Sequence, residues 1–101
     1  MILNLKDFGS FLSTRDLGEV IRNKITTSIK EEIVVIVDFA DVTQMTHSCA
    51  DEVFAKLVIE FGLPNFKKFV KMKNVDETTA TIIKYAIARR LQNKKNHNTI
   101  G

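Results

Sequence analysis

Apolar and β-branched residues gather in three short segments of the chain that predict β-strands. The clearest is residues 33–39, where five consecutive β-branched side chains suit a pleated strand. Every one of these five positions is apolar, which predicts burial on both faces, as in a central parallel strand. A shorter segment at residues 2–5 predicts another strand. In a third segment, residues 66–73, lysines alternate with apolar residues, which is typical of an edge strand.

Between these segments, apolar residues recur at the three-four spacing of an amphipathic helix. The first helix is expected to begin after Ser13, with Asp16 completing a capping box. The second is expected to begin near Ser48 and to end before Gly62 and Pro64. The third is expected to begin near residues 74–76 and to end in a basic last turn, where cations favour the negative end of the helix dipole.

The elements therefore alternate in the order β-α-β-α-β-α. This order predicts a single α/β domain with a small, mostly parallel sheet over residues 1–95, followed by a flexible tail at 96–101. If the strands lie in sequence order, right-handed crossovers bring all the helices to one face. The other face then needs a cover, for which the candidates are the tail, a reversal of strand order, a second subunit or a partner protein.

Composition agrees with a globular domain and excludes several other classes. The chain has 101 residues, 45% hydrophobic and 27% charged, which is the balance of an ordinary folded domain. It has a single cysteine, too few for a disulfide framework or a zinc module. No leader pattern and no apolar run long enough to span a membrane is present, so we expect a cytoplasmic protein with no membrane association.

Charge divides the chain into an acidic and a basic part. Residues 1–61 hold six Lys/Arg and ten Asp/Glu, whereas residues 62–101 hold nine Lys/Arg and two Asp/Glu. The basic residues of 67–95 make nucleic-acid binding the alternative function, because phosphate contacts form easily on such a surface. The sequence nevertheless has no recognition-helix motif and no aromatic stacking platform, so a solvated lysine face explains these residues more simply.

Polar residues that suit a functional site follow the central strand. Asp38, Asp41 and Thr43 lie in the loop where open α/β sheets place functional groups. Thr46, His47 and Ser48 then fall at a helix start, where unpaired N–H groups favour anions. Asp51 and Glu52 follow as expected rim charges.

Two interpretations of this helix start remain open. A phosphoryl group on a hydroxyl there adds about −1.5 to −2 charges, attracted by the helix end and repelled by the neighbouring carboxylates, which suits a switch. Alternatively, Ser48 simply caps the helix and Asp51 completes the capping box.

The block Asp38-Phe39-Ala40-Asp41-Val42, followed by residues 45–52, resembles the STAS-like domain of unknown function found in small bacterial proteins. That family shows an Asp-Phe pair at a strand end and a Thr-x-Ser-aromatic-Ala-Asp-Glu helix start, in which Cys49 here replaces the aromatic residue. Gly9 and the segment 13–15 match as well, so the resemblance extends over roughly residues 9–91.

The resemblance implies a fold related to the STAS domains of anti-sigma-factor antagonists. Those proteins are not enzymes; they bind a histidine-kinase-like ATPase that phosphorylates a serine at this helix start and so breaks the complex. Thr46 falls where they have aspartate, His47 at the phosphoacceptor serine and Ser48 at the next serine. The resemblance thus implies a regulatory module that docks a partner through residues 43–52, with any phosphorylation moved to Ser48 or Thr46.

Catalysis and cofactor binding find less support in the sequence. His47 has no second histidine or paired acid nearby to form a metal site or an acid–base pair. Asp38 and Asp41 lack the additional carboxylate or glycine loop of a magnesium–phosphate site. Cys49 is more simply a buried small hydrophobe than a reactive thiol. Arg15 is expected to form an ion pair, with the Asp38 end of the strand within reach. We therefore expect no catalytic residue, no metal and no cofactor.

Overall fold

The computed structural model describes the backbone of residues 1–100 and the side chains of residues 1–93. The elements, in chain order, are β1 (Ile2–Asn4), η1 (Leu5–Phe8), β2 (Phe11–Leu12), α1 (Arg15–Lys30), β3 (Val35–Asp38), β4 (Gln44–Met45), α2 (His47–Ala50), η2 (Asp51–Ala55), α3 (Lys56–Phe61), α4 (Leu63–Phe69), β5 (Val70–Lys73) and α5 (Glu77–Ile100). The α/β fold class is confirmed. No helix of the described residues has the length and apolarity needed to cross a membrane.

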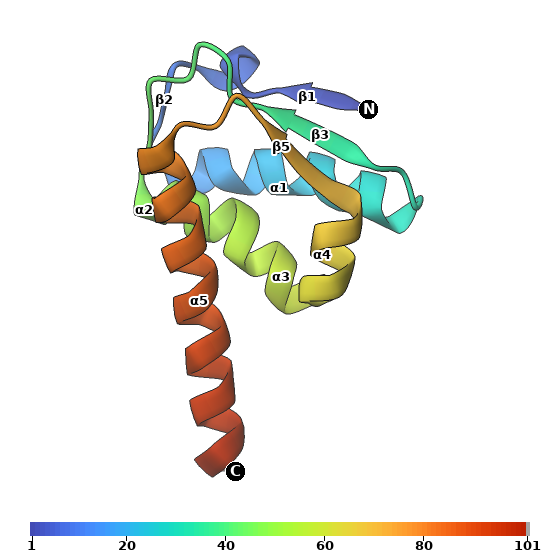
Figure 1. Ribbon diagram of the computed structural model, residues 1–101, viewed down its shortest axis with the longest axis vertical. Helices are drawn as coiled ribbons and strands as arrows, with labels where there is room; N and C mark the ends of the chain where they lie inside the picture. The colour runs from blue at the N-terminus through green and yellow to red at the C-terminus, as the bar shows by residue number, and fades with distance from the viewer. Residues whose placement is uncertain (101) are drawn as a thin grey trace.

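Three parallel strands form the main sheet, in the order β1-β3-β5. The helices lie beneath this sheet, and α5 projects away from it (Figure 1). A second, two-stranded parallel pair joins β2 to β4, with Leu12 opposite Met45. This small pair connects the start of α1 to the start of α2, because each helix begins a few residues after its strand.

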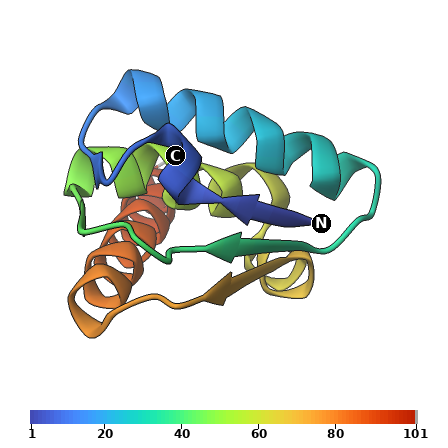
Figure 2. The same ribbon diagram turned by 90° about the horizontal axis from the view of Figure 1, so that it is seen from above.

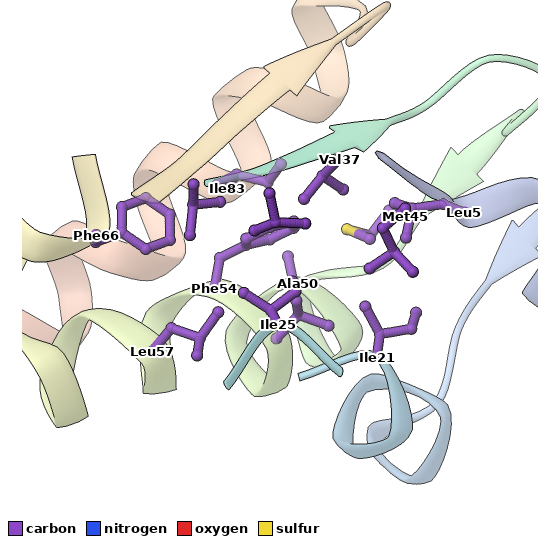
Figure 3. Packing of buried hydrophobic residues seen from close by; sticks show 14 of the residues in the cluster. Leu5, Ile21, Ile25, Val37, Met45, Ala50, Phe54, Leu57, Phe66 and Ile83 are labelled. Carbon is purple, nitrogen blue, oxygen red and sulfur yellow. The ribbon is translucent and has the colours of Figure 1, made fainter. Parts of the chain in front are cut away.

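The hydrophobic core lies between the sheet and the helices, and Phe54 is at its centre. The ring of Phe54 stacks on Phe39, with centroids 6.1 Å apart, and meets Phe66 edge-on at 6.3 Å. Figure 3 shows Val37 from β3, Ile21 and Ile25 from α1, and Ile83 from α5 converging on the same region. The segment η2, which carries Phe54, is therefore held between the sheet on one side and the helices α1 and α5.

The other face of the sheet is open. Seen from above, β1, β3 and β5 lie in front and the helices lie behind or beside them (Figure 2). Ile33 and Val34 are each 43% exposed and Ile36 is only partly buried, so the prediction that the run at residues 33–37 is buried on both faces is wrong. The physical reason is strand order, since two successive crossovers in sequence order place their helices on the same side. Within the described residues nothing covers this face, and cover by a second subunit or a partner stays a prediction.

The segment predicted as one strand over residues 66–73 is a helix followed by a strand. Pro64 lies in the first turn of α4, where its fixed φ favours a helix start. Phe66 and Phe69 are three residues apart and both are buried, so the apolar spacing here is helical. The extended backbone begins only at Val70, and the lysines of β5 are exposed, as expected for an edge strand.

The helix starts differ slightly from the prediction. Thr14, not Ser13, caps α1, because its hydroxyl accepts a hydrogen bond from the Leu17 N–H at 3.1 Å. Asp76 accepts from the Thr79 N–H at 2.7 Å and so caps α5 as expected.

The backbone of α5 continues to Ile100, whereas Gly101 and the side chains of residues 94–100 lie outside the described part of the chain. The division into a domain of residues 1–95 and a tail of 96–101 therefore stays a prediction.

Candidate functional site

Thr46 holds the start of the second helix in place. Its hydroxyl accepts a hydrogen bond from the Cys49 N–H at 3.2 Å and donates one to the Ser13 carbonyl at 3.0 Å. Thr46 is therefore the N-cap, and the alternative in which Ser48 caps the helix is wrong. Because both bonds are internal, the Thr46 hydroxyl is not free to contact a partner.

His47 and Ser48 are exposed and line a pocket of about 490 Å³. Three parts of the chain form this pocket. Its lining consists of Arg15 from α1, the start of the second helix with His47, Ser48 and Asp51, and the face of α5 with Tyr85, Ala86, Arg89, Arg90 and Asn93. The rings of His47 and Tyr85 meet edge-on, with centroids 5.5 Å apart. The start of the second helix therefore faces α5, whereas nothing in the sequence indicated that α5 lies beside it.

Asp51 connects the second helix to α5 and α1. The guanidinium of Arg90 donates two hydrogen bonds to its carboxylate, at 2.8 and 2.7 Å, and Arg15 donates a third at 2.8 Å. The two Arg90 hydrogen bonds, joined by the one from Arg15, outweigh the effect of partial burial and lower the pKa of Asp51 to about 2. Asp51 is therefore ionised in the neutral range and orients both arginines.

Glu52 is buried and faces α1. Burial by itself raises the pKa of this carboxyl group, but hydrogen bonds from Lys56, Arg22 and Arg15 lower it further than burial raises it. The Lys56 ammonium lies 3.0 Å from the carboxylate, the Arg15 guanidinium lies 3.3 Å away, and Arg22 binds it directly. The expectation that Asp51 and Glu52 are exposed rim charges is wrong, because Glu52 is only 5% exposed and Asp51 is half-buried.

The backbone around these two carboxylates is wider than an α-helix. The residues of η2 form a π-helix between α2 and α3. Such single-turn π segments inside α-helices are frequent at functional sites. Successive helical side chains point in different directions, so Asp51 reaches α5 and Glu52 reaches α1. Two neighbouring residues thereby join three helices.

The loop residues of the predicted site serve other purposes. Asp38 accepts hydrogen bonds from the Asn74 amide at 3.0 Å and the Ala40 N–H at 2.9 Å, and these bonds lower its pKa, the Asn74 bond most strongly. Asp41 adopts a positive φ of 65° and pairs with Lys6. The Thr43 hydroxyl donates to the Ser10 carbonyl at 2.9 Å.

These loop contacts stabilise turns at the strand ends. None of Asp38, Asp41 and Thr43 lines the pocket beside Ser48. The expected approach of Arg15 to the Asp38 end is wrong, since Arg15 binds Asp51 and Glu52 instead. The structure therefore separates the loop part of the predicted site from its helix part.

The sequence model of one protein family, described as the STAS-like domain of unknown function, matches residues 18–80. The match covers more than half of the chain, from within α1 to the start of α5. The chain belongs to this family. Comparison with curated proteins and with solved structures gives no match. The resemblance inferred from the sequence is confirmed, over a shorter stretch than residues 9–91.

Sequence reasoning did not place several residues of this STAS-like domain at the site. Lys56 follows Glu52 by four residues, a helical ion-pair spacing that is visible in the sequence. Arg22 and Arg90 lie 30 and 39 positions from their carboxylate partners, so no local signal connects them. Tyr85 and Arg89 reach the pocket for the same tertiary reason, and both lie beyond the matched residues 18–80.

Cys49 and His47 show no feature of a reactive or metal-binding group in the described part of the domain. Burial, with a smaller contribution from Glu52, raises the pKa of the Cys49 thiol to about 11, which disfavours the thiolate. His47 packs against Tyr85. Among residues 1–93, no three His, Cys, Asp or Glu side chains come together to hold a metal ion.

Acid is expected to weaken the STAS-like domain through Asp51. The pKa of this carboxyl is about 2 in the folded chain and 3.8 at its ordinary value, so its stabilising effect is complete above about pH 4 and is lost as the pH falls through 2. Urea unfolding of the wild type and of Asp51→Asn across this range measures the effect. The stability advantage of the wild type should shrink as the pH falls, and an advantage that stays constant would contradict the role given to Asp51.

Proposed function

We propose that this STAS-like domain is a non-catalytic, cytoplasmic regulatory module that binds a protein partner. The docking surface consists of His47, Ser48, Tyr85 and Arg89. The observation that carries the proposal is the position of Tyr85, which is 54% exposed and packs against His47 beside the exposed Ser48. Exposed tyrosine and arginine side chains are the residue types that most often dominate protein–protein binding energy.

The ion pairs behind this surface support the proposal. Asp51 holds Arg90 and Arg15, and Glu52 holds Arg22 and Lys56, so the helices that carry the exposed residues have a defined relative position. A surface that is ordered before binding loses less conformational entropy on association than a flexible one. The partner class that family resemblance suggests is a histidine-kinase-like ATPase.

Ser48 is the proposed phosphoacceptor on this surface. The Thr46 hydroxyl is engaged in two internal hydrogen bonds, whereas the Ser48 hydroxyl has no hydrogen bond to the described residues. Asp51 and Glu52, which would otherwise repel a phosphoryl group, are both paired with cations. A phosphorylated Ser48 would change the charge of the docking surface and so regulate the partner.

Binding to a histidine-kinase-like ATPase of the same organism tests the proposal. Tyr85→Ala is expected to weaken the complex about tenfold or more in calorimetry, since it removes an exposed aromatic anchor. The matched control is Ile2→Ala, which removes an exposed apolar side chain from the open face of the sheet. A complex weakened by Ile2→Ala and not by Tyr85→Ala would assign docking to that open face and contradict the proposal.

The same mixture, supplied with ATP, separates docking from modification. Mass spectrometry is expected to find phosphate on Ser48 and none on Thr46, and Ser48→Ala should abolish it. An unmodified Ser48 in a mixture that still forms the complex would remove the phosphorylation switch and leave docking intact.

The nucleic-acid alternative has weaker support. Basic residues of the 67–95 segment fall on different surfaces in the described part of the chain: Lys71 and Lys73 on β5, Lys67 and Lys84 beside an apolar groove, and Arg89 and Arg90 at the pocket beside Ser48. Arg90 is also neutralised by Asp51. A continuous basic stripe is what phosphate-backbone binding requires, and we therefore favour the protein-binding function.

A further inference from the structure

Positive charge exceeds negative charge around the pocket beside Ser48. Four basic side chains pair with Asp51 and Glu52, the two carboxylates at or behind its wall: Arg15, Arg22, Lys56 and Arg90. Arg89 adds a fifth positive charge in the lining of the pocket. Pairing with two carboxylates leaves three positive charges of this cluster without compensation. Arg89 is exposed, lines the pocket and makes no ion pair with the described residues. The pocket therefore attracts anions.

The two carboxylates orient the arginines in addition to neutralising part of their charge. Arg90 places two nitrogens on Asp51, and Arg15 uses one nitrogen for both Asp51 and Glu52. A guanidinium group has five N–H donors, so further donors of each arginine remain for a ligand. The side chains of Arg15 and Arg90 are 50% and 38% exposed, which keeps these donors within reach of solvent.

The other polar groups of the pocket match a tetrahedral anion. The Ser48 hydroxyl and the Asn93 amide both line it, and each supplies a hydrogen-bond donor. Several planar guanidinium groups around one point are the arrangement that binds the oxygens of a phosphate group, because each group donates two parallel bonds. A volume of about 490 Å³ exceeds that of phosphate alone and lies within the usual range of small-molecule sites.

We propose that this pocket, formed by Arg15, Ser48, Arg89 and Arg90, binds the phosphate group of a small phosphate monoester. Arg89 is the arginine of this set that has no carboxylate partner among the described residues, and Asp51 positions the other two arginines. The inference goes beyond the docking function and does not depend on it, since it concerns a ligand of the isolated chain. Binding of the dianion requires no chemical step.

Titration calorimetry of the isolated chain tests the inference with inorganic phosphate and with AMP, at a slightly alkaline pH where both are dianions. Both should bind saturably with one site per chain, and adenosine, which lacks the phosphate, should not bind. Arg89→Gln is expected to weaken binding about tenfold, the usual loss for one charge-assisted hydrogen bond. The matched control is Lys84→Gln, which removes one positive charge from the same helix at the apolar groove and should bind as the wild type does.

Three outcomes would overturn the inference: no saturable binding of either phosphate or AMP, equal binding of adenosine and AMP, or equal loss of affinity in Arg89→Gln and Lys84→Gln. The last outcome would indicate a general charge effect. Both variants are expected to fold, because both side chains are exposed, and circular dichroism and thermal unfolding check this. Failure of phosphate binding leaves the docking proposal intact, because that proposal is tested by the partner and by Tyr85→Ala.

Discussion

Replacing Glu52 with alanine is expected to lower the free energy of unfolding by about 3–5 kcal/mol, the usual cost of removing one partner from a buried ion-pair network. The side chain of Glu52 is 6% exposed and binds Arg15, Arg22 and Lys56. Without it, Arg22 is left with only 17% of its side chain exposed and without its carboxylate partner. Urea unfolding at neutral pH measures the loss.

Glu60→Ala provides the control, because Glu60 is an exposed acidic residue on α3 and its removal should change stability by less than about 0.5 kcal/mol. Domains of this size have a total stability of about 5–15 kcal/mol, so Glu52→Ala is expected to lie near the limit of folding. Glu52→Gln, which keeps the shape and part of the hydrogen bonding, provides a second variant. If Glu52→Ala and Glu60→Ala are equally stable, the network does not stabilise the fold.

Gly18→Ala is expected to destabilise the domain by about 1–3 kcal/mol, although alanine is the better helix former by about 1 kcal/mol. A Cβ atom at this position would lie 2.9 Å from the Glu52 Cβ and 3.1 Å from the Cys49 carbonyl oxygen. The first distance is shorter than carbon atoms tolerate, and the second contact is with backbone, which cannot rotate away. Relief therefore requires α1 to move from the second helix, which disturbs the hydrogen bonds from Arg15 and Arg22.

Glu19→Ala on the next residue of α1 separates this packing effect from helix propensity. Glu19 is exposed, so the substitution should leave the free energy of unfolding nearly unchanged. Thermal and urea unfolding of both variants measure the difference. A Gly18→Ala variant as stable as the wild type would mean that α1 and η2 do not pack as closely as the structure has them.

Local chemistry explains why the order of strands and helices was predictable. The run of β-branched residues at 33–37 overlaps β3 (Val35–Asp38), because such side chains favour extended backbone. The stripe Leu17, Ile21, Ile25 lies on the inner face of α1, because it has the helical period. The segment before β5 was predicted incorrectly, because the alternation of lysines and apolar residues at 70–73 was extended back to Phe66, although the three-residue spacing of Phe66 and Phe69 is helical. Pro64 was interpreted as a stop signal for one helix when it also begins the next.

The candidate site was predictable only in part. The sequence indicated a helix start near Thr46 and Ser48, and the structure has α2 beginning there. It did not indicate that Thr46 is the cap and Ser48 the exposed hydroxyl, because neighbouring Thr and Ser have similar capping preferences. Asp51 and Glu52 looked like surface charges, since acidic residues in a first helical turn usually are.

The amino-acid pattern alone decides that this chain is a βα domain with parallel strands and a polar helix start after the central strand, because hydrophobic period and capping act between residues that are close in sequence. Folding in three dimensions decides the rest. Strand order decides whether one face of the sheet stays open. The burial of Glu52 depends on a hydrogen bond from Arg22, which lies 30 positions away in the sequence. Such long-range charge pairs leave no periodic trace in the chain, since each partner by itself is an ordinary polar residue.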